Sequence, residues 1–156
     1  MERTLIIIKP DAVQRQLVGR IVARFERKGL KIVGLKLLHV SDDLARRMYA
    51  VHEGKDFYQP LIEFITASPV VAMVLQGCGA IAVARQLMGP TFGPDAPAGT
   101  IRGDFGLSRR YNLLHGSDSS AAAEREIPLL FSPEELVDYE LTGDKWIYAR
   151  LDDELI

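Results

Sequence analysis

The chain alternates short apolar runs with segments of helical spacing, and this alternation restricts the folds open to it. The run RTLIII (3–8) is rich in β-branched residues and is followed by Lys-Pro-Asp, which is typical of a buried strand that ends in a turn. Apolar residues then recur at helical spacing between positions 18 and 25, and Gly29 follows as a helix stop. The sequence therefore predicts a strand followed by a helix.

The same alternation continues along the chain. Further strands are expected over 30–40, 69–77 and 111–116, and further helices over 42–52, 60–67, 79–89 and 118–127. Ser41 is the expected N-cap of the helix over 42–52. Residues 89–104 contain four Gly and three Pro and are expected to form a long loop. This order predicts an α/β sandwich in one domain over 1–156, with a single sheet covered on one face.

The composition excludes several classes of protein. Hydrophobic residues make up 47% and charged residues 26% of the chain, as in ordinary globular proteins, and no apolar run is long enough to span a membrane. The first residues have charges on both sides of a short apolar run, unlike a secretory signal peptide. Cys78 is the one cysteine, which excludes an internal disulfide framework. We therefore expect a cytoplasmic protein without a membrane partner.

Charge is unevenly distributed along the chain. Residues 1–117 carry 16 Lys and Arg against 10 Asp and Glu, whereas residues 118–156 carry 3 against 11. The net charge of −2 argues against general binding of nucleic acids. The uneven distribution fits either ordinary solvated faces or a basic surface for an anionic ligand, with an acidic segment elsewhere.

His115 lies where the last predicted strand ends and the last helix begins. A lone histidine beside an apolar strand is usually a hydrogen-bonded core residue, but Gly116 permits a close approach by a ligand, and Ser117 offers a hydroxyl. An imidazole placed there could act as a base or as a nucleophile if a partner held one of its ring nitrogens. Glu126 could be that partner, although its spacing alone favours a solvated helix glutamate.

Three cations could serve an anionic substrate. Lys9 directly follows the first strand, Arg85 is the one cation of an otherwise apolar helix, and Arg102 lies in GTIRGD within the long loop. Guanidinium groups donate paired hydrogen bonds to phosphate oxygens, so a convergence of these residues would suit phosphate. Thr91 and Asn112 are neutral donors near the same segments.

Familiar nucleotide and hydrolase motifs are missing. The chain contains neither the P-loop pattern nor the G-x-G-x-x-G dinucleotide fingerprint, and HGSDS differs from the G-x-S-x-G elbow of serine hydrolases. No His/Cys cluster has the spacing of a zinc site. A bound nucleotide would have to be held by another scheme.

These residues occur within a longer resemblance. ERTLIIIKPDAVQRQLVGRIVARFERKG (2–29) resembles the opening of the nucleoside diphosphate kinase family. It is followed, with the family's order and spacing, by SPVVAMVLQG, PAGTIRGDF, NLLHGSDS and SPEELVDY. The resemblance implies a ferredoxin-like βαββαβ fold, a four-stranded antiparallel sheet covered by helices.

The resemblance also implies an activity and a set of site residues. The γ-phosphate of a nucleoside triphosphate would pass to Nδ1 of His115 and then to a nucleoside diphosphate, in a ping-pong reaction. Glu126 and Ser117 would hold the imidazole, and Phe57 would stack on the base. The positions that match the family's contacts to phosphates and ribose are Lys9, Tyr49, Arg85, Thr91, Arg102 and Asn112. Mg²⁺ would be held mainly by the substrate phosphates and not directly by the protein, and the enzyme would be a homo-oligomer, either a hexamer or a tetramer.

The chain departs from the family pattern at several positions. Val51 replaces an acidic residue, Asp56 replaces a proline, and Arg109 stands where a small apolar residue is usual. The loop over 92–98 differs from the family's sequence in a region that contributes to subunit contacts, and the tail ending in ARLDDELI is long enough to pack on a neighbouring subunit. An alternative interpretation is therefore an interaction protein or nucleotide sensor that has lost turnover. Histidine phosphatase chemistry is disfavoured because Leu114, and not arginine, precedes His115.

Overall fold

A four-stranded antiparallel sheet forms the centre of the computed structural model, which describes residues 1–151 and 154–155. The strands are β1 (Glu2–Ile8), β2 (Lys31–Leu38), β3 (Val70–Gly77) and β4 (Leu114–Gly116), in the spatial order β2-β3-β1-β4. Both central strands pair antiparallel with each of their neighbours. The ferredoxin-like fold expected from the resemblance is thus confirmed.

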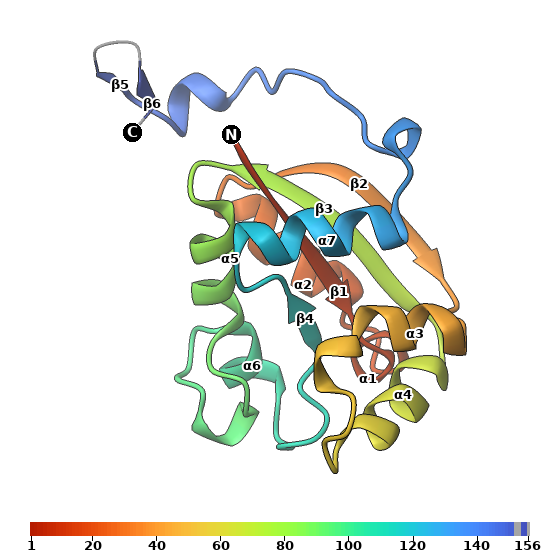
Figure 1. Cartoon of the computed structure of the whole chain (residues 1–156). Coiled ribbons are helices and arrows are strands. Elements are labelled where there is room, and N and C mark those ends of the chain that lie inside the picture. Colours follow the sequence, from red (N-terminus) through yellow and green to blue (C-terminus); the bar gives the residue numbers. More distant parts are fainter. Residues whose placement is uncertain (152–153, 156) are drawn as a thin grey trace.

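Helices cover both faces of this sheet (Figure 1). One face packs against α3 (Asp42–Met48), α4 (Tyr58–Thr66) and α7 (Ser120–Leu130). The other packs against α1 (Pro10–Gln14), α2 (Val18–Arg27), α5 (Ala80–Met88) and α6 (Ile101–Phe105).

The expectation of one covered face was wrong, and β1 shows why. Leu5 and Ile7 contribute to one apolar cluster, and Ile6 and Ile8 to the other, so four consecutive side chains are fully buried. A strand buried on both faces has a continuous apolar run in place of an alternating one. The unbroken run in RTLIII therefore indicated two covered faces.

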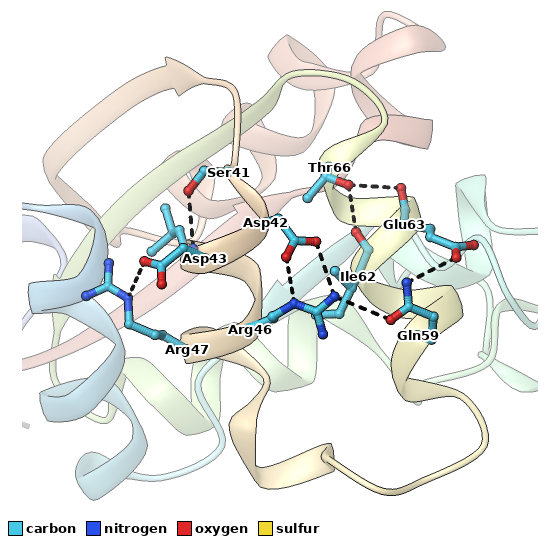
Figure 2. Close-up of polar contacts among 10 residues, drawn as sticks. Ser41, Asp42, Asp43, Arg46, Arg47, Gln59, Ile62, Glu63 and Thr66 are labelled. Carbon is cyan, nitrogen blue, oxygen red and sulfur yellow. Dashed lines mark hydrogen bonds and ion pairs between the residues drawn. The ribbon is translucent and has the colours of Figure 1, made fainter.

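Helices α3 and α4 contribute to one wall of the cavity described below. Polar side chains on the outer surface of the two helices form the hydrogen bonds drawn in Figure 2. The Ser41 hydroxyl caps α3 as predicted, accepting a hydrogen bond from a backbone N–H of the first turn. Arg46 donates to Asp42 one turn earlier, at 2.6 Å, and to Gln59 of α4, at 3.5 Å. Gln59 in turn donates to Glu63. Of these bonds, the one from Arg46 to Gln59 joins the two helices, whereas the others lie within α3 or within α4.

Two short helices were not predicted. Pro10 and Asp11 begin α1, with Lys9 as its N-cap, where a turn was expected. The long loop contains α6 as well as the 3-10 turn η2 (Gly93–Asp95). Both α helices have five residues, too few to show a hydrophobic period. Their start signals were nevertheless present, since Pro occupies the first position of α1 and the Thr100 hydroxyl caps α6.

The chain after α7 runs along the edge strand β2. It contains the 3-10 turns η3 (Pro133–Glu135) and η4 (Asp144–Trp146) and ends in the short strands β5 (Arg150–Leu151) and β6 (Glu154–Leu155). Val137 N–H donates to the Val33 carbonyl at 2.8 Å, and the Tyr139 hydroxyl donates to Ile32 O. In Figure 1 the last part of this segment, in blue, extends beyond the helices. Within the described residues, no helix combines the length and the apolar character needed to cross a membrane.

Candidate active site

A cavity of about 640 Å³ opens beside the edge strand β4. Its walls come from the α3–α4 connection, the end of α5, the segment before β4, and α7. The cavity brings together the following predicted site residues: Lys9, Tyr49, Phe57, Arg85, Thr91, Arg102, Asn112, His115 and Glu126. Ser117 lies behind this lining, fully buried.

His115 occupies the middle of β4, opposite Ile7 of β1, and 23% of its side chain is exposed. Its Nε2 lies 3.1 Å from Glu126 Oε2. The same carboxylate oxygen accepts a hydrogen bond from the Ser117 hydroxyl at 2.8 Å. Glu126 is buried, so the solvated position favoured by spacing alone was wrong. Helix α7 packs across β1, and Glu126 lies on the face turned toward the sheet.

The surroundings of Glu126 fix its charge and the tautomer of His115. Burial by itself would raise the pKa of Glu126, but hydrogen bonds from His115 and Ser117 and the nearby Arg125 charge hold it below the usual value. A carboxylate accepts only, so Nε2 of His115 must carry the hydrogen. For Nδ1, no hydrogen-bond partner is found among the residues that the structure describes. The imidazole thus presents a lone pair on the nitrogen remote from Glu126.

Lys9 and Asn112 form a buried polar pair beside this imidazole. The Lys9 ammonium donates to Asn112 Oδ1 at 2.7 Å, and Asn112 donates to the backbone of Thr91. Burial and the positive charge of Arg102 lower the pKa of Lys9 to about 8, a shift that Asp11 partly opposes. Lys9 is therefore mostly protonated at neutral pH and available to an anion.

Arg102 connects three segments around the cavity. Its guanidinium donates to the carbonyls of Asn112 at 3.0 Å, Gly89 at 2.9 Å and Leu114 at 2.7 Å. Burial and the charge of Arg85 lower its pKa to about 10, so it remains a cation. Arg102 consequently both braces the site and contributes positive charge. We call the region around Lys9, Arg85, Arg102, His115 and Glu126 the inner end of the cavity.

Aromatic side chains line the opposite region, which we call the outer end and define by His52, Phe57, Phe64, Phe92 and Arg109. Phe57 is the N-cap residue of α4 and is 52% exposed. Tyr49 lies between the two ends, with its ring edge-on to His115 at a centroid distance of 6.0 Å. Its hydroxyl is buried without a partner in the described part of the chain, and burial followed by the charge of Glu126 raises its pKa.

Comparison with known proteins identifies this arrangement. Residues 2–136 match the family model described as nucleoside diphosphate kinase. The chain belongs to the nucleoside diphosphate kinase family. A nucleoside diphosphate kinase of Desulfitobacterium hafniense is 55% identical over 147 residues, which cover 94% of this chain and 99% of that protein. One of Gloeobacter violaceus is 55% identical over 148 residues, 95% of this chain and 99% of the relative.

Solved structures agree. A halophilic nucleoside diphosphate kinase from Halobacterium salinarum, in complex with CDP, superposes with a TM-score of 0.93 at 50% identity. The match covers 95% of this chain and 99% of that one. The protein is therefore a phosphotransferase that acts on nucleotides, carrying a γ-phosphate from a nucleoside triphosphate to a nucleoside diphosphate. The interpretation as a sensor without turnover is not needed.

The departures from the kinase pattern gather at the outer end. Val51 is exposed and lines the cavity, and the exposed Asp56 directly precedes Phe57. Arg109 pairs with Asp95 at 3.2 Å, and its guanidinium lies 5.3 Å from the centre of the Phe92 ring. Arg109 thereby links the altered loop over 92–98 to the segment that precedes β4.

The cavity lining also contains aromatic side chains that were not among the predicted site residues: His52, Phe64 and Phe92. Of these, His52 lies between two predicted site residues, Tyr49 and Phe57. Its ring lies 5.3 Å from that of Phe57 and 6.4 Å from that of Tyr49. The signal available was its place in YAVH, as one of only three histidines in the chain. Nothing in that spacing showed that the ring would lie inside the cavity.

Proposed function

We propose that this kinase works by a ping-pong mechanism in which Nδ1 of His115 is the nucleophile. The observation that carries the proposal is the grip of Glu126 on Nε2, which leaves the Nδ1 lone pair facing a cavity lined with cations. A histidine whose second nitrogen is held by a carboxylate is oriented and electron-rich, as covalent catalysis requires.

The reaction has two phosphoryl-transfer steps, the first onto His115 and the second from His115 onto a nucleoside diphosphate. The Nδ1 lone pair forms a bond to the γ-phosphorus, the bond from that phosphorus to the β,γ-bridging oxygen breaks, and the nucleoside diphosphate leaves. A second nucleoside diphosphate then attacks with a terminal β-phosphate oxygen, and the N–P bond breaks. During the transfer the ring gains positive charge while Nε2 keeps its hydrogen, and the Glu126 carboxylate stabilises that charge. Ser117 keeps the carboxylate in place.

The inner end supplies the electrostatic stabilisation. Phosphoryl transfer depends mainly on alignment and on charge stabilisation around a loose transition state. Lys9, Arg85 and Arg102 place three cations in the lining for this purpose, and Asn112 orients Lys9. Thr91 and the hydroxyl of Tyr49 complete the polar contacts to phosphates and ribose.

Magnesium fits this lining as a partner of the substrate. In the described chain no group of three or more His, Cys, Asp or Glu side chains is arranged to hold a metal. The carboxylates of the lining are Asp118 and Glu126, and Glu126 is already engaged by His115 and Ser117. Mg²⁺ would bridge phosphate oxygens of the nucleotide and neutralise part of their charge.

The outer end accounts for binding of the nucleoside. Phe57 offers an exposed aromatic ring on which a base can stack. Stacking uses the π-face that every base has, so discrimination among bases is expected to be weak.

The remaining expectations concern the whole molecule. We take residues 1–156 as one kinase domain of a cytoplasmic homo-oligomer, a hexamer or a tetramer. Exposed apolar side chains on β2 and the tail, such as Leu37, Val137 and Trp146, support subunit contacts. Sedimentation equilibrium would give the number of subunits.

A phosphoenzyme assay tests the mechanism. Protein incubated with Mg²⁺ and γ-labelled ATP should acquire acid-labile, base-stable label that moves to added GDP. His115→Ala should acquire none while its circular dichroism stays that of the native chain. His39→Ala is the matched control, because His39 is exposed and lies outside the cavity lining. Label retained by His115→Ala would remove His115 as the nucleophile.

A further inference from the structure

His52 lies between the nucleophile and the proposed base platform. It ends the 3-10 turn η1 (Ala50–His52), which follows α3. Its ring stacks on Tyr49 with an interplanar angle of 22° and meets Phe57 at 60°, and Tyr49 in turn lies edge-on to His115. The rings of His115, Tyr49, His52 and Phe57 thus form a continuous series, which we call the aromatic row.

Lys55 anchors the outer half of this row. Its ammonium lies 3.1 Å from Nδ1 of His52 and 5.6 Å from the centre of the Phe57 ring. An ammonium only donates hydrogen bonds, so Nδ1 must accept, and the imidazole must be neutral with its hydrogen on Nε2. One cation therefore contacts both His52 and Phe57, and it does so only while His52 is uncharged.

We infer that His52 is a positioning residue, which together with Lys55 holds the Phe57 ring in the orientation that receives the base. The inference rests on the proposed role of Phe57. An exposed ring at a helix start without such contacts would lose rotamer freedom when a nucleotide bound, and that loss lowers affinity. The edge contact with His52 and the cation over the ring remove part of this cost before the nucleotide arrives.

The same geometry makes nucleotide affinity sensitive to acid. Burial, then the positive charge of Lys55 and the nearby His115, lower the pKa of His52. Of its two chain neighbours, Val51 carries no charge and Glu53 is an exposed carboxylate, and the carboxylate of Glu126 is already bonded to His115 and Ser117. Protonated His52 would face an ammonium at hydrogen-bond distance. Like charges so close repel, so Lys55 would leave and release Phe57.

Equilibrium binding of Mg²⁺-ADP, measured by calorimetry, tests the inference. At about pH 7.5, His52→Ala should weaken binding about 3- to 10-fold, the range expected for an aromatic pair contact. The loss should lie in affinity and not in turnover at saturating nucleotide. His52→Phe keeps an aromatic edge beside Phe57 and should restore most of the affinity.

A double-mutant cycle shows whether His52 acts through Phe57. If it does, His52→Ala combined with Phe57→Ala should bind no more weakly than Phe57→Ala alone. Fully additive losses would overturn the positioning role. Normal affinity of Phe57→Ala would refute the base platform itself, and with it the inference. Weak binding by Phe57→Ala with normal binding by His52→Ala would refute the inference alone.

The pH dependence separates positioning from simple packing. Between about pH 7.5 and about pH 5.5, across the ordinary titration range of histidine, the wild type should lose affinity relative to His52→Phe. Titration of the nucleotide phosphates affects both proteins equally and cancels in the ratio. A ratio that does not change with pH would show that the charge of His52 has no part in binding.

Discussion

The two ends of the cavity differ in how they are built. At the inner end Lys9, Arg102, Asn112 and Glu126 are buried, and each makes hydrogen bonds to other parts of the site. They lie at the end of β1, on helices packed against the sheet, and beside β4. At the outer end the exposed side chains belong to the connections over 49–57 and 89–111.

This difference matches the distribution of departures from the family pattern. Val51, Asp56, Arg109 and the loop over 92–98 all belong to the connecting segments of the outer end. A change at the inner end would leave a buried donor or charge without its partner, which costs far more than a change on an exposed loop. The phosphoryl-transfer residues are thus constrained by their buried contacts around the sheet, whereas the residues that contact the nucleoside can vary.

The largest expected effect tests how firmly the inner end depends on its carboxylate. Glu126→Gln removes the negative charge that orients His115 and stabilises the charged ring during transfer. We expect turnover to fall by about 10²-fold or more, the usual range for loss of such a partner. Steady-state rates with ATP and GDP measure this.

Glu124→Gln is the matched control, since Glu124 lies on the same helix and is exposed. If both variants lost activity equally, the effect would come from the charge of α7 and not from the bond to His115. A Glu126→Gln enzyme with native turnover would contradict the assignment of Glu126.

The inner end was largely predictable from the sequence because its residues stand beside regular elements. Lys9 follows a strand and His115 lies in one. The sequence therefore already predicted that both residues lie where strands of the sheet end. The partnership of Glu126 with His115 was not predictable from spacing, since it depends on how α7 packs across β1. The family resemblance implied this partnership, whereas the spacing along the helix favoured a solvent-exposed Glu126.

The outer end was less predictable for a physical reason. His52 ends the short turn η1, Phe92 precedes the short turn η2, and Arg109 lies in the connection before β4; these segments are too short or too irregular to give a periodic signal. His52 was missed because its place depends on the backbone path between α3 and α4. The fold shows the same limit, since the strands were located correctly while the covering of both faces was not.

A smaller effect comes from the titration of Lys9. Its pKa of about 8 predicts that kcat/KM falls above pH 8, by up to about tenfold per pH unit, as the cation is lost. Lys9→Arg keeps its charge in this range and should show no such decline, whatever its absolute rate. An identical alkaline limb in both enzymes would assign the titration to another group.

The same titration should make the contribution of Lys9 to the stability of the fold rise with pH, whereas kcat/KM falls. The folded pKa of Lys9, about 8, lies below the ordinary lysine pKa of 10.5, so between these values the unfolded chain binds more protons. The contribution of Lys9 to the free energy of unfolding therefore rises with pH across this window. Denaturant unfolding of the wild type and Lys9→Met, compared at several pH values, measures the difference.

The smallest expected effect lies at the outer end. Arg109→Val removes the ion pair with Asp95 and the contact with Phe92, both on the cavity rim. Exposed ion pairs contribute little, so nucleotide affinity should change by less than about fivefold and turnover should stay near that of the wild type. Binding of Mg²⁺-ADP and Mg²⁺-GDP would show whether the change depends on the base. A large loss of turnover in Arg109→Val would break the division between the two ends, because it would mean that the loop over 92–98 positions the phosphates as well as the nucleoside.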